Sequence, residues 1–106
     1  MAKYLIEASY TAAGIQGLAK DKASGRLAAV KKAAKSAGGS LESLYFSFGE
    51  RDVIGVLNMP DNISAAALAL AVASSGMVNL KTTPLLTVEE VDKALSAATA
   101  YRAPGA

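Results

Sequence analysis

The chain has 106 residues, which is the length of a single domain. Hydrophobic residues make up 52% and charged residues 19%, as in packed globular proteins, and the net charge of +2 is too small to indicate nucleic acid as a partner. The chain contains no cysteine and no histidine, which excludes disulfides, thiolate metal sites and histidine-based catalysis, so we expect no metal and no cofactor.

The sequence has neither the pattern of a signal peptide nor that of a membrane-spanning helix. Lys3 is followed by a short apolar run that Glu7 interrupts, which is not the pattern of a signal peptide. The longest apolar stretch, residues 63–73, is shorter than the ~20 residues that a membrane-spanning helix needs. We therefore expect a soluble, cytoplasmic protein with no membrane partner.

The first elements are predicted to be a strand and two helices. Residues 3–10 alternate as a strand, with one face formed by Tyr4, Ile6, Ala8 and Tyr10. Thr11 can cap a helix of only one or two turns, because Gly14 and Gly17 weaken it. A longer helix over residues 22–37 follows, with an apolar stripe, and Gly38-Gly39 ends it.

This longer helix also carries most of the basic charge, as Lys22, Arg26, Lys31, Lys32 and Lys35. These side chains spread around the polar half of the helix, and the helix dipole favours cations near its C-terminus. A solvated face is the favoured interpretation. A phosphate-binding surface is the alternative.

A hairpin forms the centre of the chain, with strands over residues 40–48 and 52–59 joined by the turn Gly49-Glu50-Arg51-Asp52. Leu44, Phe46 and Phe48 are predicted to share one face of its first strand, with Leu41 and Tyr45 on the other. Both faces are largely apolar, so something should cover each side. Gly55 in mid-strand indicates a bulge or a close approach of another backbone.

The last third is predicted to be helix, strand and helix. Asp61 or Asn62 caps a helix to about residue 75 that is apolar nearly all round, so we expect it to be buried on more than one side. Residues 77–86 form an edge strand containing Pro84. A capping box over residues 87–90 explains the acidic cluster of the last helix without a metal. The buried stripe of this last helix is predicted to consist of Val91, Leu95 and Ala98.

The order strand, helix, strand, strand, helix, strand is that of the ferredoxin-like fold, an α+β arrangement with a four-stranded antiparallel sheet. The final helix is an addition to that plan. We expect one domain over residues 1–101 and a loose tail over residues 102–106.

A set of short motifs resembles a known family. In chain order these motifs are Tyr10-Thr11, Gly14-Ile15, Gly17-Leu18, Gly49-Glu50-Arg51-Asp52-Val53, Pro60-Asp61, Gly76-Met77-Val78 and Thr87-Val88-Glu89-Glu90. Their order and spacing over about residues 3–95 are similar to the GYD domain family, small bacterial and archaeal proteins of the dimeric α/β-barrel group. The family signature has a tyrosine where this chain has Arg51, so a role of that hydroxyl does not carry over.

The resemblance implies a ferredoxin-like protomer whose open sheet face packs against a second copy. It implies little about activity, because the function of the family is unknown. Both the resemblance and the two apolar faces of the hairpin therefore predict a homodimer, with higher assembly left open.

Five residues are candidates for binding a small molecule: Tyr10, Tyr45, Arg51, Asp52 and Asn58. Each has a structural alternative. Asp52 can cap the turn while Arg51 is solvated, the tyrosines can pack with their hydroxyls at an edge, and Asn58 can satisfy a buried backbone group.

Three classes of function remain. The first is a dimeric small-molecule-binding or regulatory protein with a pocket between sheet and helices. The second is a cofactor-independent enzyme of the dimeric α/β-barrel type, although no Ser-His-Asp set or phosphate loop is present. The third, RNA binding, is disfavoured because the third strand lacks the aromatic residues on which bases stack.

Overall fold

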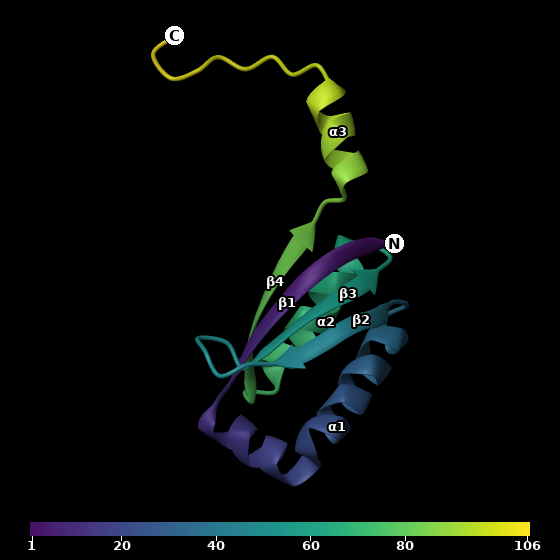
Figure 1. Ribbon diagram of the computed structural model, residues 1–106, viewed down its shortest axis with the longest axis vertical. Helices are drawn as coiled ribbons and strands as arrows, with labels where there is room; N and C mark the ends of the chain where they lie inside the picture. Colours follow the sequence, from purple (N-terminus) through teal and green to yellow (C-terminus); the bar gives the residue numbers. More distant parts are fainter.

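The computed structural model describes residues 1–106 and contains four strands and three helices. The elements in chain order are β1 (Ala2–Tyr10), α1 (Ala12–Ser36), β2 (Ser40–Phe46), β3 (Val53–Met59), α2 (Asn62–Ser74), β4 (Val78–Leu85) and α3 (Val88–Ser96). The strands form one antiparallel sheet in the order β2-β3-β1-β4, drawn in Figure 1. This is the predicted ferredoxin-like topology with an additional C-terminal helix.

The core lies on the side of the sheet that α1 and α2 cover. β1 and β3 alternate in exposure, and the residues that β1 buries are Tyr4, Ile6 and Ala8, the face predicted from the sequence. Ala34 of α1 and Ala65 of α2 are also buried against this face, as part of the same hydrophobic cluster. Alanine at these positions brings each helix close to the sheet.

α1 is two helices joined by a kink at Lys22, where the backbone adopts φ 66° and ψ 166°. The kink falls at the predicted start of the longer helix. The part before it was predicted to be one or two turns, but it runs from Ala12 towards the kink, about three turns at 3.6 residues per turn. Gly14 and Gly17 do not end it, because tertiary contacts at its N-terminus outweigh their low helix propensity.

β2 differs from the prediction at both of its ends. It stops at Phe46, so Phe48 lies in the loop and its side chain is fully exposed instead of sharing a strand face. Near its start, the pairing with β3 shifts between Leu41 and Ser43, which leaves Glu42 as the extra residue of a bulge. The bulge turns Leu41 to the core side, away from the face that carries Tyr45.

The close approach predicted at Gly55 is confirmed. A Cβ atom at this position would lie 2.7 Å from the Ser43 carbonyl oxygen and 3.0 Å from Leu44 Cδ1. The bulge that the sequence allowed at this point lies on the neighbouring strand instead.

α2 is not buried on more than one side, contrary to the prediction. Ala65 is its only buried residue, while Ile63 and Leu70 on the outer side are 81% and 70% exposed. The helix is apolar all round, but a single chain covers only the side that faces the sheet.

α3 contradicts the prediction of a buried stripe. The capping box of Thr87 and Glu90 forms as predicted, but α3 buries no residue and ends before Ala98. Figure 1 shows α3 and the tail projecting beyond the end of the sheet, away from α1 and α2. Val91 and Leu95 are 41% and 79% exposed. None of the three helices is long and apolar enough to cross a bilayer.

Candidate functional site

An apolar cavity of about 110 Å³ lies between the sheet and the two covering helices. We call it the core cavity. All four strands, α1 and α2 contribute to it, and 13 of its 14 lining residues are hydrophobic. The lining residues are Ile6, Ala8, Tyr10, Arg26, Ala29, Val30, Ala33, Leu44, Val53, Leu57, Leu68, Val72, Val78 and Leu80.

Small and larger side chains alternate along the elements that line the cavity. The α1 positions that line it alternate between alanine and larger side chains, namely Arg26, Ala29, Val30 and Ala33. Leu68 and Val72 of α2 lie four residues apart and so face the cavity from the same side of their helix. The wall is therefore formed entirely within regular elements, which favours a preformed site.

Arg26 is the only charged residue of the core cavity. Its side chain is 32% exposed, and its guanidinium lies 3.7 Å from a carboxylate oxygen of Asp21, an ion pair beyond the usual hydrogen-bond distance. The guanidinium has five N–H donors, and the structure contains no hydrogen bond from any of them. A cation with free donors therefore lies at the edge of an apolar space.

A second pocket adjoins the core cavity at the kink of α1. It has a volume of about 280 Å³ and shares Tyr10, Arg26, Val72 and Val78 with the core cavity. Its other lining residues come from the first part of α1 and from the turn before β4: Ala13, Gly14, Gly17, Leu18, Asp21, Ser75 and Met77. Arg26 thus lies where an apolar space meets a more polar one.

The N-terminus of α1 is fixed against the turn before β4, and this contact forms one wall of the adjoining pocket. The Thr11 amide donates to the Met77 carbonyl oxygen at 2.9 Å, and the Thr11 hydroxyl accepts a bond from the Gly14 amide at 3.1 Å. Only glycine fits at position 14, because a Cβ atom there would lie 2.0 Å from the Met77 carbonyl oxygen. This packing places the first part of α1 beside the adjoining pocket.

The structure places Asp52 in a structural contact. Its carboxylate accepts a hydrogen bond from the Tyr10 amide at 2.8 Å, and its own amide donates to the Ala8 carbonyl oxygen at 2.8 Å. The hairpin loop is thereby attached to the end of β1. Tyr10 also lines both pockets, so among the predicted site residues it is the one that borders the core cavity.

The remaining predicted site residues lie elsewhere. Arg51 is half-buried in the hairpin loop, where its carbonyl oxygen accepts a bond from the Ser47 hydroxyl. Tyr45 is 72% exposed and pairs with Ile54 on the face of the sheet that no helix covers. The structure therefore brings Tyr10 and Asp52 together, and places Arg51, Tyr45 and Asn58 apart from the core cavity.

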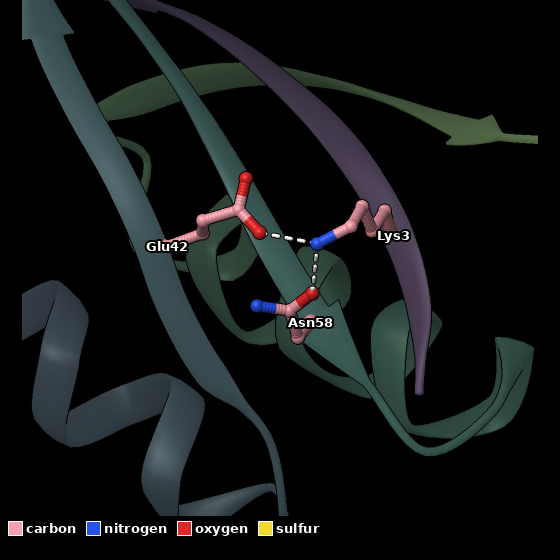
Figure 2. A network of polar contacts seen from close by, with 3 residues as sticks. All are labelled: Lys3, Glu42 and Asn58. Atoms are coloured by element: carbon pink, nitrogen blue, oxygen red, sulfur yellow. Dashed lines mark hydrogen bonds and ion pairs between the residues drawn. The ribbon is translucent and has the colours of Figure 1, made fainter. Parts of the chain in front are cut away.

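Asn58 belongs to a polar cluster on the open face, shown in Figure 2. Lys3 Nζ donates to the Asn58 side-chain oxygen at 2.9 Å and to the carboxylate of Glu42, the bulge residue of β2. The hydrogen bond from Lys3 lowers the pKa of the Glu42 carboxyl below its ordinary value, against a smaller opposing effect of desolvation. The cluster thus links β1, β2 and β3 through side-chain contacts.

Arg26 is one of the basic residues that were predicted to lie on a solvated face of the longer helix. A signal was present, since Arg26 lies four residues before Val30, a member of the apolar stripe, and residues at this spacing share a helix face. Leu68 and Val72 were not distinguished from the other apolar residues of α2. Which residues of α2 line the core cavity depends on how α2 crosses the sheet, and this is a feature of the tertiary structure.

The comparison with protein-family models decides the family. The model of the GYD domain matches residues 4–95, which is most of the chain. The chain belongs to the GYD domain family. A search of curated proteins and a search of solved structures each returned no match. In this GYD domain, the match begins within β1 and ends within α3, so it includes every residue of both pockets.

Proposed function

We propose that this GYD domain is a small-molecule-binding protein whose ligand occupies the core cavity. The observation that carries the proposal is an apolar space with one charged residue at its edge, enclosed by four strands and two helices. Ligand sites are concave and mostly apolar, with few polar groups that orient the ligand. An apolar cavity of roughly 150 Å³ in another protein accepts benzene, so this space suits a single ring or a short chain.

A cavity-filling variant tests the proposal. Ala29 lines the cavity, whereas its neighbour Ala28 is exposed and does not. Ala29→Leu is expected to abolish the binding of small apolar probes such as indole, measured by ligand-observed NMR, and Ala28→Leu is the matched control. Equal probe binding by wild type and Ala29→Leu would contradict the proposal. A bound probe that is recovered chemically unchanged supports binding alone, whereas its conversion to a product would indicate an enzyme.

We also propose that a second copy of the chain covers the open face of the sheet. Leu5, Tyr45, Ile54 and Val56 are neighbours on this face, which we call the open-face patch. Leu5 pairs with Val56, and Tyr45 with Ile54, so the patch spans three strands. The polar cluster of Lys3, Glu42 and Asn58 borders it, an arrangement typical of an apolar interface with a polar rim.

The chain exposes more area than a compact monomer of its mass. A compact monomer of this mass, 10.7 kDa, exposes about 5,500 Å², whereas this chain exposes 7348 Å². A stable interface of standard size buries about 800 Å² on each partner. The excess area, to which the exposed side of α3 contributes, is sufficient for one such interface.

A further inference from the structure

We infer that the ligand of the core cavity is a carboxylate: a small organic anion with an apolar ring or chain. The inference rests on the proposed function and goes further by naming the chemical class. The apolar body occupies the core cavity, and the carboxylate lies at its edge, where it accepts hydrogen bonds from the guanidinium of Arg26.

The position of Arg26 supports this class. Arg26 is the only charged residue that lines the core cavity, and Asp21, its partner in the ion pair, lines the adjoining pocket. A guanidinium offers planar, paired donors that match the two oxygens of a carboxylate, and such charge-assisted bonds are stronger than neutral ones.

The present partner of Arg26 leaves those donors free. The ion pair with Asp21 is 3.7 Å long and lies at the surface, where the side chain of Asp21 is 51% exposed. Exposed ion pairs contribute little to stability because water screens them. A ligand carboxylate at hydrogen-bond distance would therefore interact with Arg26 more strongly than Asp21 does.

The size of the two pockets limits the ligand. The core cavity accommodates a ring or a short chain, and the adjoining pocket of about 280 Å³ leaves room for the carboxylate and its water at the shared residue Arg26. Long-chain lipids are too large for the core cavity of about 110 Å³. Phosphorylated metabolites do not match either, because Arg26 provides the only positive charge in the two pockets.

Benzoate and benzamide test the inference, because they have nearly the same shape and differ in charge. Dissociation constants measured by calorimetry on the full chain are expected to be roughly tenfold lower for benzoate. Arg26→Gln should remove this preference, because the charge-assisted bonds to benzoate are lost and the two affinities become similar. Lys32→Gln, which removes the same charge from an exposed position of α1, should retain it.

Asp21→Asn provides a second test, because it removes the competitor without touching Arg26. It is expected to tighten benzoate binding several-fold more than benzamide binding. Equal affinity of wild type for benzoate and benzamide would overturn the carboxylate class and leave the proposed function standing. Binding of neither compound, together with no binding of indole, would overturn both.

Discussion

Lys22 holds a backbone conformation that its own side chain disfavours. Its φ of 66° and ψ of 166° lie in a region that glycine occupies readily and other residues at a cost of about 1–3 kcal/mol. The bend it makes separates the part of α1 that borders the adjoining pocket from the part that covers the sheet. The strain at this residue is thus linked to the shape of the site.

Lys22→Gly is therefore expected to stabilise the protein by about 1 kcal/mol, because glycine removes the strain at the kink. Urea denaturation monitored by circular dichroism gives the free energy of unfolding. Lys20→Gly, two residues earlier in regular helix, should destabilise by a similar amount. A loss of stability in both variants would show that Lys22 is not strained in solution.

Asp61 makes stability depend on pH. The Ser64 amide donates to its carboxylate at 2.8 Å, and this hydrogen bond is the main cause that lowers the pKa of Asp61 below its ordinary value. A lowered pKa in the folded state means that the ionised form contributes stability above the pKa of the unfolded chain. That contribution is lost as the pH falls through the lower, folded pKa.

We expect the melting temperature to fall as the pH drops below about 4, the ordinary pKa of aspartate. Asp61→Asn keeps a good cap but removes the titrating group, so its melting temperature should change less over this range. Glu50→Gln, a loop carboxylate to which no amide donates, is the control and should behave as wild type. Identical pH profiles for wild type and Asp61→Asn would count against the role of this cap.

At the scale of elements, two glycines in the first part of α1 have different tertiary surroundings. Gly14 faces the turn before β4 at a distance that excludes any side chain, whereas nothing lies within 4 Å of a Cβ atom built at Gly17. Helix propensity treats the two positions alike. Their tertiary surroundings do not.

Gly14→Ala is expected to destabilise the protein by about 1–3 kcal/mol, because the Met77 carbonyl oxygen must move and α1 must shift from β4. Gly17→Ala should instead stabilise it by about 0.5–1 kcal/mol, since alanine favours helix and meets no contact. Thermal and urea unfolding of the pair measure both effects. Equal changes in the two variants would mean that α1 does not pack against Met77 as described.

The whole molecule is elongated for its length. Its radius of gyration is 16.9 Å, whereas a compact chain of about 100 residues has a radius near 13 Å. α3 and the tail, which project from the end of β4 in Figure 1, account for this shape. The exposed apolar area is distributed over the open-face patch, the outer side of α2, and α3.

The proposed dimer predicts which of these surfaces matters for association. Ile54→Asp, in the open-face patch, is expected to convert a dimer to a monomer, because it buries an unpaired charge in the interface. Ile63→Asp, on the outer side of α2 and 81% exposed, should leave the dimer intact. Light scattering coupled to size exclusion measures both. A wild-type chain that is monomeric at micromolar concentration would refute the dimer.

The sequence by itself determined the element order, the faces of β1 and the cap of α3, because these depend on local periodicity and on capping within one helical turn. It also indicated the boundary near Lys22 between the two parts of α1 and the close approach at Gly55. Only the tertiary structure decided that Glu42 forms a bulge, that α2 and α3 remain exposed, and that Arg26 borders the core cavity. These features depend on how the helices cross the sheet, which is a matter of contacts between residues far apart in the chain.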